Sequence, residues 1–403
     1  MSEFILMFGT LPIMHMDITG NHIALTEDDT KINHAVYRKM CTQLSNFDKV
    51  ITERLQYPTR EALINILHKA NINTLEQYAK SLYCINITDA FWVKTVNDKT
   101  YWNCINAFKN CMNTTIANAA LNDYNLAKLV VNGMSHILTT PSPQYKLSGS
   151  ADKCVKRTSN GLFMYKSCGE LSSEIWASRP YSEWLVTRVY EKLDIPERYY
   201  VKYRYKEEKR STGYYKPYSI CPIFTNENTS LIEYRDTKFA SKSMEELKAG
   251  LAKTGNNDAA NEIRTMNVMD SLVLNIDRHD RNYGMLLDNK TFNYIGLAPI
   301  YDNDCALGST IGVSKSNGSF DELYNILKNK CHVDCYNSIN DVALRNMTLP
   351  MYKKLKSIGR IDLTKELNQI QGISQRRKDF IQYILDRRLA EILDVVDSYL
   401  ANR

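Results

Sequence analysis

The sequence contains no apolar run long enough to cross a membrane. No segment of its 403 residues approaches the roughly 20 consecutive apolar residues that a spanning helix needs. Apolar residues occur near the start, but Glu3 comes early and no basic stretch precedes them, so a secretory signal is not indicated. We therefore expect a cytoplasmic protein without a membrane partner.

Paired cysteines of the CxxC type are also missing. The ten cysteines are scattered along the chain, a distribution typical of reduced thiols and not of a disulfide framework. A structural zinc site normally has four ligands, and no CxxC pair lies near the compact Cys/His cluster from Cys331 to Cys335. A metal at that cluster is only weakly indicated.

A strong excess of one charge is missing as well. The chain has 51 basic and 45 acidic residues, and its formal net charge of +6 is mild for its length. Charge alone therefore makes direct nucleic-acid binding an unlikely function. With 44% hydrophobic and 24% charged residues, the composition is that of an ordinary globular protein with one large body or about two to three domains.

The first part of the chain combines a short β-meander with helices. Apolar residues alternate over residues 4–25, and over residues 31–79 their spacing becomes helical, with a break at Pro58. Residues 85–135 have the pattern of irregular chain with short helices. A boundary is predicted at residues 139–143, where prolines and small polar residues gather.

Beyond that boundary the pattern changes to strands and then to helices. Strands are predicted at residues 153–156 and 161–166, a helix at 181–193, and a hairpin within 200–224. This order is typical of the N-lobe of a kinase. The later chain is mainly helical and ends in a long helix whose apolar stripe, over residues 380–400, we assign to core packing.

The predicted fold is therefore α+β, with three parts. Residues 1–138 form a mixed N-terminal region, residues 139–224 a β-rich nucleotide-binding N-lobe, and residues 225–403 a mainly helical catalytic C-lobe.

An Asp and an Asn five residues apart, followed by a second Asp, form the most informative pattern of the chain. They are Asp277, Asn282 and Asp302. In phosphoryl transfer one carboxylate takes the proton of the acceptor hydroxyl, while an Asn amide and another carboxylate hold Mg²⁺ on the phosphates of ATP. Asp277 is therefore the predicted base, and Asn282 and Asp302 are the predicted metal ligands. A hairpin over residues 285–297 would return Asp302 to the side of Asn282.

The residues inside this loop leave alternatives open. His279 has no proton to move if Asp277 is the base, so we expect its imidazole to hydrogen-bond the loop backbone. Arg278 and Arg281 could contact phosphate or brace the loop, and the sequence favours neither. The order Asp-Arg-His reverses the His-Arg-Asp of ordinary protein kinases, which indicates an atypical kinase.

A lysine at the end of an apolar strand is the candidate contact to the α- and β-phosphates of ATP. It is Lys166, and Glu183 on the following helix could pair with it, as in protein kinases. Glu174 is the competing partner of the lysine. The ordinary alternative for both pairs is an ion pair on the surface.

Two further segments are placed to bind the nucleotide. Residues 147–153 have one glycine, so as a phosphate loop they are a weak signal, and their weight comes from lying one hairpin before Lys166. Residues 220–224, which leave the predicted hairpin and include Pro222 and Phe224, would form a hinge that offers backbone groups to adenine.

With these motifs, the chain resembles the HipA-like serine/threonine kinases, whose fold is related to that of the phosphoinositide kinases. The motifs span residues 147–302, and residues 1–130 resemble the front region of a clade of HipA-like proteins from Gram-positive bacteria and their phages. The resemblance implies a bilobal kinase-like fold and ATP and Mg²⁺ as cofactors. It implies catalytic Asp277, Asn282 and Asp302 and the nucleotide-binding residues Ser148, Gly149, Ser150, Lys153, Lys166, Glu183, Pro222, Phe224 and His279.

The chain departs from the family pattern at the phosphate loop. Family toxins often carry a serine just before that loop, and its autophosphorylation shuts the enzyme down. Lys146 stands there in this chain, although Ser148 and Ser150 lie within reach. The N-terminal region does not obviously match the part of family toxins that meets an antitoxin, so an antitoxin is a candidate partner by resemblance alone.

The function predicted from the sequence is that of an ATP- and Mg²⁺-dependent serine/threonine protein kinase, with a protein as its substrate and a toxin–antitoxin role as an option. One alternative is a phosphotransferase for a lipid or small molecule, which no membrane helix or strong basic patch supports. The other is a catalytically inactive nucleotide-binding module. Intact Lys166, Asp277, Asn282 and Asp302 argue against that module.

Overall fold

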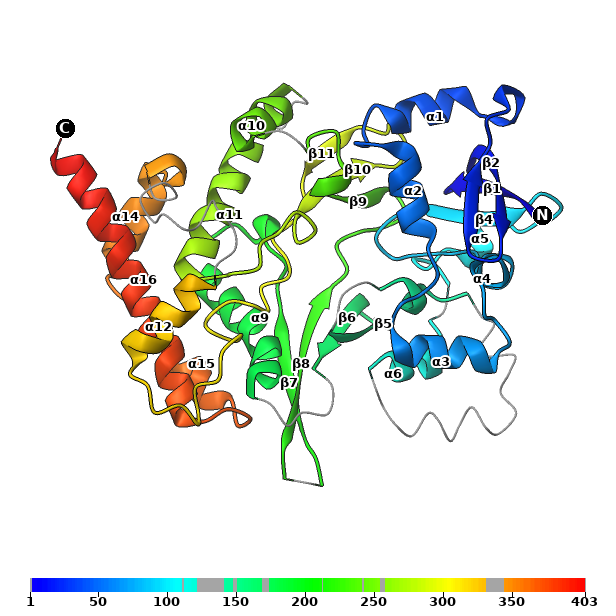
Figure 1. The fold of residues 1–403 in the computed structure, drawn as a ribbon. Coiled ribbons are helices and arrows are strands. Elements are labelled where there is room, and N and C mark those ends of the chain that lie inside the picture. The colour runs from blue at the N-terminus through cyan, green and yellow to red at the C-terminus, as the bar shows by residue number, and fades with distance from the viewer. Residues whose placement is uncertain are drawn as a thin grey trace. The chain divides into compact units, whose positions relative to one another are not determined.

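The computed structural model describes residues 2–110, 112–121, 141–147, 151–168, 174–211, 213–240, 243–253, 258–330 and 344–402. The chain divides into two compact units, each built from separate stretches of sequence (Figure 1). The first unit takes residues 1–165, 222–243 and 284–296, and the second takes residues 166–221, 244–283 and 297–403. Both units contain strands and helices, so the predicted α+β class is confirmed.

Three of the predicted features lie outside the described residues. They are the domain boundary between residues 138 and 139, the phosphate-loop residues Ser148, Gly149 and Ser150, and the Cys331–Cys335 cluster. Within the described residues, none of the helices has the length and apolarity of a membrane span.

The first unit opens with the predicted meander. Strands β1 (Ser2–Phe8), β2 (Leu11–Thr19) and β3 (His22–Leu25) are antiparallel neighbours, and β4 (Phe91–Thr95) extends their sheet on the far side of β1. Strand β4 lies where irregular chain was predicted. Its first three residues are all buried, so it lacks the alternation by which a half-buried strand is recognised.

Short helices and a second small sheet complete the first unit. The break at Pro58 falls, as predicted, between two helices. The helices are α1 (His34–Cys41), α2 (Phe47–Leu55), α3 (Glu61–Lys69), α4 (Leu75–Leu82), α5 (Trp102–Ile105) and α6 (Thr114–Ala120). The sheet consists of β9 (Thr229–Glu233), β10 (Gly284–Asp288) and β11 (Tyr294–Leu297), in the order β11-β10-β9.

A third sheet contains the two predicted strand pairs. Its strands are β5 (Asp152–Thr158), β6 (Gly161–Ser167), β8 (Tyr215–Pro222) and β7 (Arg204–Lys209), in the order β5-β6-β8-β7. Strands β7 and β8 form the predicted antiparallel hairpin, with Arg204 opposite Ile220 and Lys209 opposite Tyr215. The division between the two units falls inside β6, after Tyr165.

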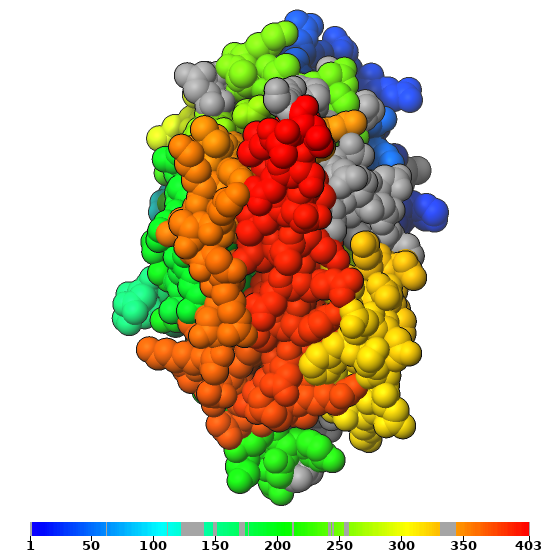
Figure 2. All heavy atoms as spheres, turned by 90° about the vertical axis from the view of Figure 1, so that its left-hand side faces the viewer, coloured from blue at the N-terminus to red at the C-terminus, as the bar shows by residue number. Residues whose placement is uncertain are grey.

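Helices dominate the second unit and enclose its core. The helices are α9 (Glu174–Lys192), α10 (Met244–Lys253), α11 (Ala259–Val273), α12 (Phe320–Asn329), α14 (Leu349–Ile358), α15 (Thr364–Gln369) and α16 (Gln375–Ala401). Apolar residues of α9, α11 and α16 share one buried cluster. Figure 2 shows α16 with α14 on one side and α12 on the other. The stripe predicted over residues 380–400 is therefore a core-packing face, and Leu400 at its end is 49% exposed.

Helix α9 begins earlier than the sequence pattern indicates. The predicted helix spans residues 181–193 and so begins just after Pro180. In the structure the helix starts at Glu174 and includes Pro180. The carboxylate of Glu174 anchors the first turn by accepting hydrogen bonds from Arg377 and Ser314, contacts that no local pattern encodes.

Candidate active site

The predicted catalytic loop follows directly from the end of a buried helix. Helix α11 ends at Val273, and the next residue, Leu274, adopts a left-handed conformation with φ of 51° and turns the chain out of the helix. The backbone N–H of Asn275 then donates to the carbonyl of Asp270 at 2.9 Å, and the N–H of Asp277 donates to the Asn275 side chain at 3.3 Å. These two hydrogen bonds therefore fix the start of the loop at the end of α11.

A buried arginine braces this loop. Arg278 is 2% exposed, and its Nε and Nη2 donate to the two carboxylate oxygens of Asp270 at 2.8 and 3.0 Å. Its Nη1 donates to the carbonyl of Asn282 at 2.6 Å and to the carbonyl of Tyr301. The structure thus settles one open alternative, because Arg278 is a brace.

The same arginine ties together the two chain segments on which the predicted metal ligands lie. Nη2 of Arg278 also donates to the side-chain oxygen of Asn303 at 2.7 Å. One buried guanidinium therefore holds both the loop that ends at Asn282 and the segment that starts at Tyr301. Such charge-assisted, bidentate contacts fix geometry better than a flexible ammonium would.

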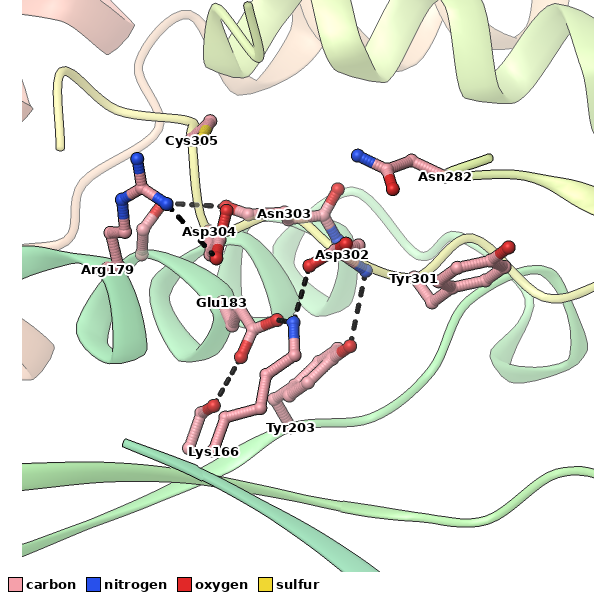
Figure 3. A network of polar contacts seen from close by, with 12 residues as sticks. Lys166, Arg179, Glu183, Tyr203, Asn282, Tyr301, Asp302, Asn303, Asp304 and Cys305 are labelled. Carbon is pink, nitrogen blue, oxygen red and sulfur yellow. Dashed lines mark hydrogen bonds and ion pairs between the residues drawn. The ribbon is translucent and has the colours of Figure 1, made fainter. Parts of the chain in front are cut away.

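Lys166 lies between two carboxylates (Figure 3). Its Nζ is 2.6 Å from Oε1 of Glu183 and also contacts Oδ1 of Asp302. The hydroxyl of Ser219 donates to the other oxygen of Glu183. The alternative partner Glu174 pairs with Arg377 instead, at 2.8 Å. Of the two candidates, the structure pairs Lys166 with Glu183.

Burial and the neighbouring charges shift the pKa values of Lys166 and Glu183 in opposite directions. Burial lowers the pKa of the Lys166 ammonium, but the carboxylates of Asp302 and Glu183 raise that pKa well above its ordinary value, so the lysine is protonated. Burial raises the pKa of the Glu183 carboxyl to about 7, and the Lys166 ammonium opposes the shift. Glu183 is fully buried, so its negative charge depends on the lysine beside it.

The backbone of Asp302 is in the left-handed region, with φ of 58°. Its N–H donates to the hydroxyl of Tyr203 at 3.2 Å. Residues other than glycine adopt this conformation at some cost, and such residues cluster at functional sites where the surroundings hold them. The unusual turn at Asp302 therefore fits a residue that must present its carboxylate in one direction.

Asp277 lies beside a cysteine and an amide. The thiol of Cys305 donates to Oδ2 of Asp277 at 3.7 Å, and Nδ2 of Asn282 donates to the Asp277 carbonyl at 2.8 Å. Asp277 is exposed to solvent. Partial loss of water around its carboxyl nevertheless raises the pKa of that group, and Asp304 and Asp302 add to the rise, while His279 opposes it.

His279 and Asp304 occupy supporting places around these residues. The predicted backbone contact of His279 is present, since its Nδ1 accepts from the N–H of Arg281 at 3.2 Å. The carboxylate of Asp304 lies 3.8 Å from Nη1 of Arg179 (Figure 3). Three carboxylates, those of Asp277, Asp302 and Asp304, thus influence one another in a small region.

The side-chain oxygen atoms of Asn282 and Asp302 are suited to a magnesium ion that also binds phosphate. Among the described residues, no three His, Cys, Asp or Glu side chains are grouped so as to hold a metal without other ligands. Mg²⁺ is usually held by one or two carboxylates together with substrate phosphates and water. Asn282 and Asp302 offer such hard oxygen atoms, and the mutual repulsion of the carboxylates around them favours a cation.

Three further residues of the predicted nucleotide site are assigned to the first unit. They are Lys153, Pro222 and Phe224, and their nucleotide-binding roles stay predictions. Reasoning from the sequence missed the contributions of Tyr203, Ser219 and Cys305 to the cluster. Nothing in the sequence marks them, because each is a single polar residue that contacts a partner distant in the chain.

Comparisons with known proteins give two distant structural likenesses. Neither a family model nor a curated protein matches the chain. The chain is similar to the proinflammatory kinase CtkA of Helicobacter pylori, with 20% identity and a TM-score of 0.46 over 64% of this chain and 93% of that one. It is also similar to a chain of the HipA, HipB and operator DNA complex of the Shewanella oneidensis toxin–antitoxin system, with 10% identity and a TM-score of 0.44 over 97% and 99%.

At TM-scores below 0.5 neither likeness decides the function of this chain. The function is inferred instead from the geometry of the cluster around Lys166.

Proposed function

We propose that the chain is an ATP- and Mg²⁺-dependent kinase that phosphorylates serine or threonine in a protein substrate. The observation that supports this most is the Lys166 ammonium held between Glu183 and Asp302, with Arg278 joining the Asp277 loop to the Asp302 segment. Phosphoryl transfer from ATP requires a fixed cation, a metal-binding carboxylate and a separate base. In this proposal Lys166 is the cation, Asp302 binds the metal and Asp277 is the base.

In this proposal each residue has one task. Lys166 binds the α- and β-phosphates as a positive point charge, and Glu183 holds its ammonium in place. Asp277 accepts a hydrogen bond from the acceptor hydroxyl and takes its proton late in transfer. General-base help of this kind contributes roughly 10²- to 10⁴-fold. A raised pKa brings the carboxyl of Asp277 closer to neutral pH, where a base is most effective.

Asn282 and Asp302 would hold Mg²⁺. When bound, the ion neutralises negative charge on the phosphates. The side-chain amide of Asn282 already donates its N–H to the Asp277 carbonyl, which leaves its carbonyl oxygen as the ligand. Arg278 holds Asn282 and Asp302 close to each other through its contacts to the carbonyls of Asn282 and Tyr301.

A toxin–antitoxin role, with an antitoxin as partner, rests on the family resemblance alone. A lipid or small-molecule acceptor is the second candidate function, and a direct experiment separates the two. The purified protein is incubated with γ-labelled ATP and a cell lysate, and the labelled species are identified.

The proposed function predicts label on serine or threonine of a protein. Label in the lipid or small-molecule fraction alone would instead support the second candidate. The absence of label in every fraction, with ATP bound, would identify an inactive nucleotide-binding module.

A further inference from the structure

Tyr203, which lies just before β7, contacts the backbone of the predicted metal ligand Asp302. Its side chain is 4% exposed, and its hydroxyl accepts the Asp302 N–H at 3.2 Å. Figure 3 shows this contact beside the pair formed by Lys166 and Asp302. The hydroxyl of Tyr203 thus binds the main chain of Asp302, while the ammonium of Lys166 binds its carboxylate.

Tyr203 is itself held by helix α9. The Tyr203 N–H donates to the hydroxyl oxygen of Thr187 at 3.1 Å, and that hydroxyl donates to the carbonyl of Glu183, one turn earlier in α9, at 3.2 Å. Thr187 is 2% exposed, so water competes little for these contacts. One turn of α9 therefore holds both Lys166 and Tyr203.

These contacts close into a ring of five residues. From Glu183 the ring passes to Thr187, Tyr203 and Asp302, and it returns to Glu183 through the ammonium of Lys166. Its members come from α9, from the segment before β7, from the turn at Asp302 and from β6. The ring therefore fixes four separate stretches of chain relative to one another within the second unit.

The two contacts of Asp302 in this ring differ under the proposed function. The contact of its carboxylate to Lys166 gives way when the lysine binds phosphate and the carboxylate binds Mg²⁺. The contact of its N–H to Tyr203 uses the backbone, so it persists in both states. The left-handed φ of 58° at Asp302 carries a conformational cost in both states as well.

We propose that Tyr203 is a positioning residue, whose hydroxyl keeps the Asp302 carboxylate directed at Mg²⁺ once Lys166 has turned to the phosphates. The inference rests on the proposed function and goes beyond it, because it gives a role to a residue outside the proposed set of ligands. The role belongs to the hydroxyl alone, since the hydroxyl accepts the N–H of the left-handed turn.

A purely structural role of Tyr203 would have a different signature. A hydroxyl that only stabilises the fold would do so equally with and without Mg·ATP. In the ring, by contrast, the contact of Lys166 still holds Asp302 in the nucleotide-free protein. Loss of the Tyr203 hydroxyl should therefore have its main effect when Mg·ATP is bound.

The test is Tyr203→Phe, which removes the hydroxyl and keeps the ring. We expect Mg·ATP to bind about tenfold more weakly, a factor that corresponds to one lost hydrogen bond to a buried N–H. ATP in the presence of EDTA should bind with wild-type affinity, because Lys166 and Glu183 are unchanged. Isothermal calorimetry measures both affinities. Equal weakening with and without Mg²⁺ would overturn the positioning role.

Tyr190→Phe is the matched control. Tyr190 is a buried tyrosine of the same unit, 1% exposed, and among the described residues its hydroxyl has no hydrogen-bond partner. This variant should bind Mg·ATP as the wild type does. The same loss of affinity in both variants would show a general effect of removing a buried hydroxyl and would contradict the role of Tyr203.

Amide hydrogen exchange gives a readout that does not depend on affinity or activity. In the protein with Mg·ATP bound, the peptide that contains Asp302 should exchange faster in Tyr203→Phe than in the wild type or in Tyr190→Phe. If Tyr203→Phe does not fold, Thr187→Val is used instead, because it removes the hydroxyl that holds the Tyr203 N–H. It should show both changes at smaller size, and the absence of both would overturn the inference.

The failures of the two proposals differ in these experiments. If the wild type binds Mg·ATP and Tyr203→Phe binds it equally well, with unchanged exchange at Asp302, the positioning role is overturned and the proposed function stands. If the wild type binds no Mg·ATP, both are overturned.

Discussion

At the scale of single residues, the candidate site depends on one cation between two carboxylates. Lys166 is buried, and an unpaired ammonium there would be costly. Glu183 and Asp302 remove that cost, but they do so from different places, since Glu183 lies on a helix and Asp302 on a strained turn. Under the proposed function, Asp302 would exchange its contact to the lysine for a contact to Mg²⁺.

The first prediction concerns this exchange. Asp302→Asn removes a charged ligand but keeps the shape of the side chain, so Mg·ATP should bind about 10- to 100-fold more weakly, the range typical of disturbed metal sites. Calorimetry with and without Mg²⁺ measures the effect, and Asp280→Asn in the exposed part of the loop is the matched control. Unchanged Mg·ATP affinity in Asp302→Asn would remove its role as a ligand.

The second prediction concerns pH. The pKa of Glu183 is raised from 4.5 to about 7, so acidification through about 7 protonates Glu183 and frees Lys166 from its partner. We expect the transfer rate to fall over that range. A carboxyl with a raised folded pKa stabilises the folded chain as pH falls from about 7 toward 4.5, so unfolding is not the cause.

A matched variant separates Glu183 from other groups that titrate. Glu183→Gln removes the titrating carboxyl, so its lower rate should no longer fall near pH 7. A fall of the same size in both proteins would show that another group is responsible, and thermal melting at each pH confirms that both stay folded.

The sequence predicted these residues better than it predicted their neighbours. The spacing of Asp277, Asn282 and Asp302 is itself a chemical pattern, and the structure brings their segments together through Arg278. The choice between Glu183 and Glu174 needed the three-dimensional structure, because both lie at plausible distances from the lysine in sequence. It was decided by Arg377, which is over 200 positions from Glu174 in sequence.

At the scale of elements, α16 holds the second unit together. Phe380 is 0% exposed, packs against the ring of Phe320 at 5.3 Å and lies against Gly308, where an added Cβ would come within 2.9 Å of its ring. Gly308 has φ of +73°, a conformation that favours glycine. The segment that follows Asp302 therefore packs directly on α16.

The third prediction uses two residues of the same stripe. Phe380→Ala should lower the free energy of unfolding by about 3–5 kcal/mol, because it leaves a cavity in a packed core. Leu400→Ala, at a position that is 49% exposed, should change it by less than about 0.5 kcal/mol. Urea unfolding measures both. Similar losses in the two variants would contradict the assignment of the stripe to the core.

Two elements differ from their prediction for a common physical reason. Strand β4 is buried along its first three residues and so shows no alternation, while α9 begins before Pro180 because Glu174 is anchored by distant groups. By contrast, strand β2 of the meander alternates in burial from Met14 to Ile18, and α16 follows a helical period, and both periods are properties of the local sequence. The periodicity of apolar residues predicts which face of a segment is buried, but it does not predict contacts with residues that are distant in the sequence.

At the scale of the whole molecule, each of the two units is assembled from three stretches of chain. The segment 284–296 belongs to the first unit, although the loop before it and Asp302 after it belong to the second. The amino-acid composition does not change at the points where the chain passes from one unit to the other. The division into three consecutive parts that the sequence indicates stays a prediction. All residues of the Lys166 cluster nevertheless lie in one unit.

The central claim is that Asp277 is the base of a phosphoryl transfer. The measurement that tests it most directly is the initial rate of label transfer from γ-labelled ATP to a lysate protein by wild type, Asp277→Ala and Asp280→Ala. Asp280 lies three residues away in the same loop and is exposed, so it controls for the loss of a charge. We predict a loss of at least about 100-fold for Asp277→Ala and a wild-type rate for Asp280→Ala. Equal transfer by wild type and Asp277→Ala would contradict the account.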